Sequence, residues 1–234
     1  MTNITNYSYL IQSMLGSMGS SWGTGSTLPG MFQFSQLNSS SIQAQLKAAG
    51  IDTSSKQYKA AIGHMTKNGC TGAMYTSVQS IKNLMSQYDK NGDYINPVNG
   101  LTGLDVTEKA DGSYKKIIDI PKSSLDEMFA LVKKEFIQEN GVANGDTTKR
   151  SDVYTNLYKK MEKDDRLTAG YTLQQYERAY RNALYNAIWE SDPDWQIGQS
   201  FDTSILDNIT RESVESTLVQ NGNTFTVDSV DYRI

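Results

Sequence analysis

The sequence predicts a mainly α fold: a helical bundle-like domain with a small β-hairpin and an irregular, flexible N-terminal arm. Three observations predict it. Apolar residues recur at helical spacing over most of the chain beyond residue 40. Clusters of Asp, Asn, Gly and Pro interrupt this spacing at a few places. The first forty-six residues contain no Lys, Arg, Asp or Glu. We therefore expect an uncharged arm, residues 1–38, and a single mainly helical domain, residues 39–234, with candidate sub-units 39–95 and 122–220.

The N-terminal arm is rich in Ser, Gly, Thr, Asn and Gln, a composition that buries too little apolar surface to offset backbone entropy. Its apolar residues, such as Leu10 and Trp22, could dock on the folded body or on a protein partner. A second interpretation is an export or assembly segment, because an uncharged, unfolded leader is easily threaded through a secretion machinery. No Lys or Arg precedes the apolar stretch 9–18, which excludes a Sec signal peptide. The protein is then cytoplasmic, or exported without such a signal.

Three helices are expected in the first part of the domain. Serines at residues 39–41 can cap the first, which Gly50 ends. The second should run from about Ser54 to Asn68, and the third from about Gly72 to Tyr88. The segment 89–104 is dense in turn residues and is predicted to be a loop. Beyond it, residues 104–107 and 114–120 are predicted to pair as a β-hairpin.

The second helical group should begin at Ser124, which starts a capping box in Ser-Leu-Asp-Glu. The elements expected from there on are a helix down to Gly141, helices over about 151–161 and from Thr172 to about 190, short helices near 203–208 and 211–219, and a β-like tail over 224–227.

Composition excludes several classes of function. The net charge is −4, the isoelectric point is about 5.1, and no stretch is polybasic, so nucleic acid is not expected as a partner. No apolar run approaches the roughly 18 residues that span a membrane. Cys70 is the single cysteine and His64 the single histidine, which excludes a disulfide framework and a multi-histidine zinc site.

No residue is assigned a catalytic role. His64 and Cys70 are expected to be structural, since no nucleophile signature surrounds them. Glu135 and Glu139, one helical turn apart beside two lysines, are predicted to lie on a solvated face. The aromatic group formed by Tyr185, Trp189 and Trp195 is interpreted as core packing rather than as a sugar-binding platform.

The strongest chemical pattern is the loop Asp89-Lys90-Asn91-Gly92-Asp93, which directly follows a predicted helix. Oxygen side chains at positions one, three and five of a tight loop suit Ca²⁺, which takes six to eight oxygen ligands. The candidate ligands are therefore Asp89, Asn91 and Asp93. The same residue types are the commonest turn formers, so a plain helix-terminating turn is the competing interpretation.

The loop departs from an EF-hand or dockerin half-site at two positions. Tyr94 stands where that loop has glycine, and Gly100 stands where it has the closing glutamate. If the loop is one residue shorter, Ile95 takes the β-bridging place. The closing carboxylate would then come from Asp105 or be absent.

Several strings of the sequence are similar to a family of proteins from Bacillus and Clostridia-like Firmicutes that is catalogued as a domain of unknown function. The strings are SSIQAQLKAAGIDT (40–53), SKQYKAAI (55–62), IKNLMS (81–86), YDKNGDY (88–94), TTKRSD (147–152) and QYERAY (175–180). The resemblance covers roughly residues 40–220 and implies no activity or site. Separately, ITNYSYL (4–10) resembles the start of short clostridial proteins associated with flagellar operons.

Three functional hypotheses follow. The first is a non-enzymatic structural or interaction protein, exported or associated with the cell surface, which uses the uncharged arm. The second is a calcium-dependent binding module centred on residues 89–93. The third is a hydrolase with unrecognised carboxylates, for which a deep pocket holding a desolvated Asp or Glu would be the observation.

Overall fold

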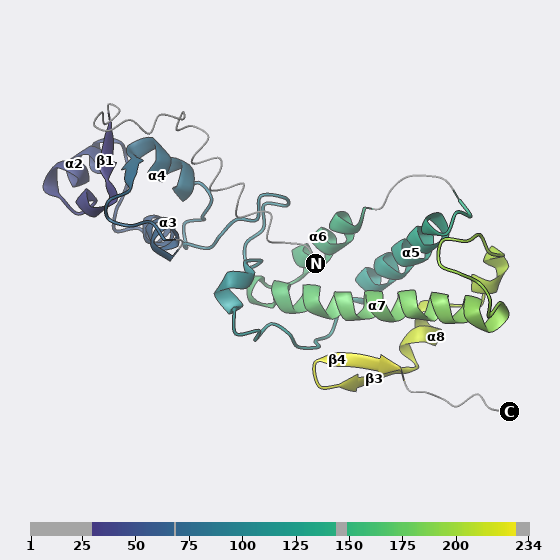
Figure 1. The fold of residues 1–234 in the computed structure, drawn as a ribbon. Helices are drawn as coiled ribbons and strands as arrows, with labels where there is room; N and C mark the ends of the chain where they lie inside the picture. The colour runs from purple at the N-terminus through teal and green to yellow at the C-terminus, as the bar shows by residue number, and fades with distance from the viewer. Residues whose placement is uncertain (1–29, 68, 144–148, 228–234) are drawn as a thin grey trace. The chain divides into compact units, whose positions relative to one another are not determined.

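The structure is a computed structural model that describes residues 30–67, 69–143 and 149–227 (Figure 1). The chain divides into two compact units, residues 1–95 and 96–234, called here the first and second unit. Helices dominate both, with two small antiparallel strand pairs, so the predicted mainly α fold is confirmed. The unit boundary coincides with the end of the candidate sub-unit 39–95. The single domain 39–234 stays a prediction.

The first unit contains β1 (Met31–Gln33), η1 (Phe34–Gln36), α2 (Ser40–Ala48), α3 (Lys56–Lys67), β2 (Tyr75–Ser77) and α4 (Val78–Met85). The first predicted helix is confirmed as α2, and Ser39 caps it by accepting from the Ile42 N–H. Gly50 follows it with a φ of 80°, the left-handed conformation that ends many helices. The second predicted helix is confirmed as α3.

The third predicted helix is wrong in its first six residues. Residues 75–77 instead form β2, which pairs with β1 so that Met31 faces Ser77 and Phe32 faces Thr76. Ser77 then caps α4 by accepting from the Ser80 N–H. The apolar spacing around residues 75–77 favours a helix, but their backbone groups bond to β1, which is distant in the sequence.

The flexible arm expected over residues 1–38 is corrected at its C-terminal end. Residues 31–36 form β1 and η1, and Phe32 and Leu37 are buried in the core of the first unit. Pairing with β2 and burial of these two side chains offset the entropy that composition alone left uncompensated. The rest of the predicted arm, residues 1–29, lies outside the described residues.

The core of the first unit forms around α2, α3 and α4. Leu46, Ala61 and Ile81 are fully buried in it. Gln57 on α3 donates to the carbonyl oxygens of Met85 and Tyr88, at 2.8 and 2.7 Å, and so fixes the end of α4 against α3.

The second unit contains η2 (Val106–Lys109), α5 (Lys122–Glu139), α6 (Arg150–Lys160), η3 (Lys163–Asp165), α7 (Arg166–Ser191), η4 (Thr203–Leu206), α8 (Arg211–Glu215), β3 (Leu218–Asn221) and β4 (Thr224–Val227). Figure 1 shows α7 running along α5 and α6, with the β3–β4 hairpin at its side. Met128, Val132 and Phe136 of α5 meet Leu173, Tyr180 and Leu184 of α7 in one core, and all six are fully buried.

The β-hairpin predicted for residues 104–107 and 114–120 is wrong. Asp105 accepts from the backbone N–H and hydroxyl of Thr107 and so caps the short helix η2. Further along, the Thr172 hydroxyl of α7 donates to the Lys116 carbonyl and accepts from the Ile118 N–H. Two backbone groups of this segment therefore bond to a helix, and no described strand pairs with it. The predicted β-like tail is confirmed as β4, and β3 replaces the end of the helix predicted over 211–219.

Two helices of the second unit begin earlier than predicted. α5 starts at Lys122 with Pro121 as N-cap and no side-chain capping bond, because Ser124 lies buried inside the helix. α7 starts at Arg166, six residues before Thr172, because its first turns pack against the rest of the unit. Thr168, Ala169 and Gly170 are all buried there. No helix in the described residues is long and apolar enough to cross a membrane.

The close packing at Gly170 gives a test of the fold. A methyl group at position 170 would lie 2.5 Å from the Tyr158 hydroxyl oxygen, whereas one at Gly63, inside α3, would meet nothing within 4 Å. We expect Gly63→Ala to stabilise its helix by about 0.5 to 1 kcal/mol. Gly170→Ala should instead cost about 1 to 3 kcal/mol through overpacking. Urea denaturation of both variants measures this, and equal stabilisation by both would contradict the packing of α6 on α7.

Candidate functional site

The most deeply buried charged side chain of the described residues is Glu135 on α5, with 1% of its surface exposed. It lies seven residues after Met128 and three after Val132, and therefore on the apolar face of the helix. The predicted solvated face for Glu135 and Glu139 is thus wrong for Glu135. It is correct for Glu139, whose side chain is 50% exposed.

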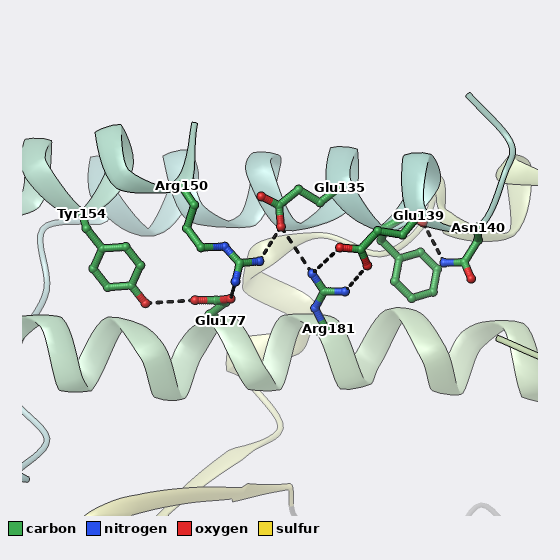
Figure 2. Close-up of polar contacts among 8 residues, drawn as sticks. Glu135, Glu139, Asn140, Arg150, Tyr154, Glu177 and Arg181 are labelled. Carbon is green, nitrogen blue, oxygen red and sulfur yellow. Dashed lines mark hydrogen bonds and ion pairs between the residues drawn. The ribbon is translucent and has the colours of Figure 1, made fainter. Parts of the chain in front are cut away.

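Two arginines from two other helices bind the same oxygen of Glu135 (Figure 2). Arg150, the first residue of α6, donates to Oε2. Arg181, in the middle of α7, reaches the same Oε2 at 3.3 Å. One carboxylate oxygen therefore ties three helices together.

The network continues on both sides of Glu135. Arg150 also pairs with Glu177 of α7 at 2.8 Å, and Glu177 accepts from the Tyr154 hydroxyl at 2.9 Å. Arg181 pairs with Glu139 at 2.5 Å. Burial, helped by the charge of Glu177, raises the pKa of Tyr154 well above its ordinary value, so this phenol stays a donor.

The contacts of Glu135 are those of a structural ion pair and not those of a catalytic acid or base. Oε2 is occupied by two guanidinium groups, and a substrate would have to displace one of them. Oε1 is buried and has no hydrogen-bond partner among the described residues. Such an oxygen carries a desolvation cost, which the two charge-assisted bonds on Oε2 must offset.

A second network fixes α8. Arg211 is 8% exposed, and it donates to Asp126 of α5 at 2.7 Å and to Glu215 at 2.6 Å. The Tyr180 hydroxyl of α7 donates to the other oxygen of Glu215 at 2.5 Å. Burial, followed by the interaction with Glu215, raises the pKa of Tyr180. Both charge networks therefore join helices that also share the apolar core.

The C-terminal end of α7 carries a cluster of aromatic rings: Phe136, Tyr185, Trp189, Trp195 and Phe201. Tyr185 stacks on Trp189 with ring centroids 5.5 Å apart and an interplanar angle of 22°. Trp195 is 4% exposed, which confirms core packing for this residue, but Trp189 is 39% exposed. The cluster thus extends from the buried Trp195 to the exposed Trp189 at the surface.

Hydrogen bonds hold the loop after α7 against this cluster. The Trp189 indole donates to the Trp195 carbonyl at 3.1 Å, and the Trp195 indole donates to the Gln199 carbonyl at 3.0 Å. The buried Asn140 accepts from the Gly198 N–H at 2.8 Å. Ile197, beside Gly198, remains 65% exposed.

The candidate calcium ligands Asp89, Asn91 and Asp93 lie together in one tight turn of the first unit. Asp89 Oδ1 accepts from the backbone N–H groups of Asn91 and Asp93, at 2.8 and 2.9 Å. Gly92 has a φ of 85°, and the Ile95 N–H donates to the Gln87 carbonyl at 2.8 Å. The turn thus gathers two carboxylates and one amide, and calcium binding by it stays a prediction.

The fifth candidate ligand, Asp105, belongs to the second unit, where it caps η2. No group of three or more His, Cys, Asp or Glu side chains in the described part of the chain is placed to hold a metal ion. The candidate loop is not such a group, because it has two carboxylates and its third side chain, Asn91, is an amide.

His64 and Cys70 show no activated nucleophile. The His64 ring packs edge-on against Tyr88, with centroids 6.2 Å apart. Burial raises the pKa of the Cys70 thiol, whereas a nucleophilic cysteine needs a lowered one.

Sequence reasoning missed the Glu135 network although a signal was present. A glutamate on the apolar stripe of a helix must find a partner, since burying an unpaired charge is costly. The stripe positions identify Glu135, but spacing along the chain does not identify Arg150 or Arg181 as its partners. These lie on other helices, and tertiary packing brings them together.

The fold and the networks define a mainly α-helical protein whose second unit contains two ion-pair networks, each centred on a buried charged side chain. The chain belongs to the family described as domain of unknown function (DUF3879), which matches residues 51–234. The expected membership in a family of unknown function is thereby confirmed. No curated protein and no solved structure matches the chain. The Firmicutes origin and the flagellar likeness of residues 4–10 stay predictions.

The Glu135 network predicts unequal effects of two similar substitutions in α5. Glu135→Gln removes the shared charge between Arg150 and Arg181 and should cost about 1 to 2 kcal/mol of unfolding free energy, since each arginine keeps a second carboxylate partner. Glu139→Gln touches the same Arg181 from an exposed position and should cost about 0.5 kcal/mol or less. Chemical denaturation followed by circular dichroism measures both losses of unfolding free energy. Equal losses would contradict the role of Glu135 in joining α6 and α7 to α5.

Calcium binding by the turn at residues 89–93 predicts a shift in thermal stability. A site with a dissociation constant of about 0.1 to 1 mM should stabilise the first unit by about 1.4 to 2.7 kcal/mol at 10 mM calcium. Asp89→Asn keeps the oxygen that accepts the backbone N–H groups and serves as the control without the carboxylate charge. An unfolding midpoint that calcium leaves unchanged in the native chain would rule out a useful site.

Proposed function

We propose that the chain is a non-enzymatic interaction protein that binds a protein partner through an exposed aromatic surface of the second unit. This Trp189 surface consists of Trp189, Ile197 and the acidic residues Glu190, Asp192 and Asp194. The observation that supports it is the exposure of two large apolar side chains beside a cluster of aromatic rings whose other members are buried or partly buried.

The base of the Trp189 surface is rigid. Tyr185 lies stacked beneath Trp189, and the indole N–H is already bonded to the Trp195 carbonyl. The loop that carries Ile197 is held through Gly198 by the buried Asn140. A partner would therefore meet pre-ordered side chains and would not have to order them, which lowers the entropic cost of binding. Tryptophan is one of the residues most enriched at interface hot spots.

The chemistry of the surface indicates the kind of partner. Glu190, Asp192 and Asp194 are all exposed and follow Trp189 within five residues. An exposed indole face attracts Lys or Arg by a cation–π interaction, and the acidic residues favour the same charge. We expect a partner segment that carries an apolar side chain flanked by Lys or Arg.

The other hypotheses have narrower support. For a hydrolase, the most buried carboxylate of the described residues is Glu135, which two arginines bind. A surface hollow of about 530 Å³ in the first unit is lined by α2 and the turn after it, including Gln43, Lys47 and Asp52, and not by Glu135.

Export of the chain is supported by its uncharged first forty-six residues, and cell fractionation that finds the protein only in the cytosol would contradict it.

The proposal is tested by site-specific photo-cross-linking in the cells that produce the protein. A benzophenone side chain at Ile197 should give a discrete cross-linked species, and the same group at Val106, a 49% exposed residue of the same unit, should not. Trp189→Ala should reduce the binding free energy of the isolated complex by about 2 kcal/mol or more, which raises the dissociation constant roughly thirtyfold. Asp192→Asn with Asp194→Asn should reduce the salt dependence of binding. Equal cross-linking at both positions, or none at Ile197, would contradict the Trp189 surface.

A further inference from the structure

The C-terminal hairpin of the second unit has one strand that packs on the helices and one that does not. Phe225 of β4 lies against Tyr176 of α7, with ring centroids 4.7 Å apart. On β3, Val219, Gln220 and Asn221 are all exposed, and only Leu218 contacts the core. In Figure 1, β4 lies between β3 and α7. The outer edge of β3, called here the β3 edge, is the free side of this two-stranded sheet.

The register of the hairpin determines which backbone groups the β3 edge presents. Asn221 faces Thr224 across a two-residue turn, and Val219 faces Thr226. In such hairpins the pair at the turn is hydrogen-bonded and every second pair after it is hydrogen-bonded too. Val219 and Asn221 therefore bond to β4, and the N–H and C=O groups of Leu218 and Gln220 point outward. No described residue bonds to these outward backbone groups.

The β3 edge has none of the features that usually prevent strands from pairing with other chains. Residues 217–227, TLVQNGNTFTV, contain no charged residue and no proline. Exposed edges in natural proteins are usually protected by lysine, proline, a bulge or a covering element. Val219 adds a 48% exposed β-branched side chain on the outer face of the sheet.

We infer that the β3 edge binds the β3 edge of a second copy of this chain, which makes a four-stranded antiparallel sheet across a two-fold axis. The outward backbone groups select the register. Leu218 must face Gln220 of the second copy, so that both exchange N–H···O=C bonds, four in all across the axis. Val219 then faces Val219 of the second copy as the central, non-hydrogen-bonded pair, and this pairing buries the exposed valine against itself.

The absence of charge supports a second copy as the occupant, and the small area sets its affinity. Two uncharged strands can approach without repulsion although each chain has a net charge of −4. A four-residue edge buries less than the roughly 1,200 Å² of a standard stable interface. The dimer is therefore weak and reversible, with a dissociation constant of about 10 µM to 1 mM. This association does not depend on the Trp189 surface.

The first test measures association of the full chain by sedimentation velocity at about 10 µM to 1 mM, the range expected for such a dimer. The native protein should shift from monomer to dimer over this range. Val219→Lys places two ammonium groups opposite each other and should weaken the dimer about tenfold or more. Thr226→Lys adds the same charge to the same face on β4 and should leave the association nearly unchanged.

The second test is covalent. Facing residues of a non-hydrogen-bonded pair have Cα atoms about 4.5 Å apart, within the range for a disulfide. In a Cys70→Ser background, Val219→Cys should form a disulfide-linked dimer under mild oxidation much faster than Thr226→Cys.

Three results would overturn the inference: a monomer at every concentration, association that Val219→Lys does not weaken, or equal cross-linking of the two cysteine variants. If Val219→Lys has no effect and deletion of residues 1–29 abolishes association, the N-terminal segment mediates it and the β3 edge does not.

Discussion

The second unit depends on a single carboxylate oxygen, Glu135 Oε2, that is shared by Arg150 of α6 and Arg181 of α7. α6 is a short helix that buries few apolar side chains, chiefly Val153 and Leu157, and two residues repeated on one face could pack in more than one register. Arg150, in the first turn of α6, must reach the buried Glu135, and this contact allows α6 only one register. Buried ion pairs contribute little net stability, since desolvation offsets most of the attraction. We therefore assign the network mainly to positioning.

The remaining surfaces of the unit follow from this arrangement of helices. Once α5 and α7 are held side by side, Phe136 and the buried Asn140 at the end of α5 meet the last turns of α7 and the loop after it. That contact holds Trp189 and Ile197 in place. Toward the other face, Arg211 and Glu215 fasten α8 to α5 and α7, and β3 begins directly after α8. The two surfaces proposed for binding therefore rest on ordered helices although both are exposed.

The sequence predicted those elements whose determinants lie within a few residues of one another. Ser39 and Gly50 delimit α2 through local capping and a left-handed turn, and the turn at Asn221-Gly222 precedes β4 as expected. The errors fall where distant partners decide. Residues 75–77 are a strand because β1 lies beside them. No described strand pairs with residues 114–120, where Thr172 of α7 instead bonds the Lys116 carbonyl and the Ile118 N–H. Glu135 was the same kind of error: its position in the stripe was visible in the sequence, but its two arginines are supplied by tertiary structure.

The second unit offers two kinds of chemistry for recognition by a partner. The two buried charged side chains of the described residues, Glu135 and Arg211, are paired with side chains of neighbouring helices, where they orient the scaffold. The two proposed surfaces present an indole face and a row of backbone N–H and C=O groups. The first can bind through dispersion and cation–π attraction, and the second through strand addition. Because the aromatic surface and the strand edge are built from different residues, each can bind a partner without the other, and loss of one would leave the other intact.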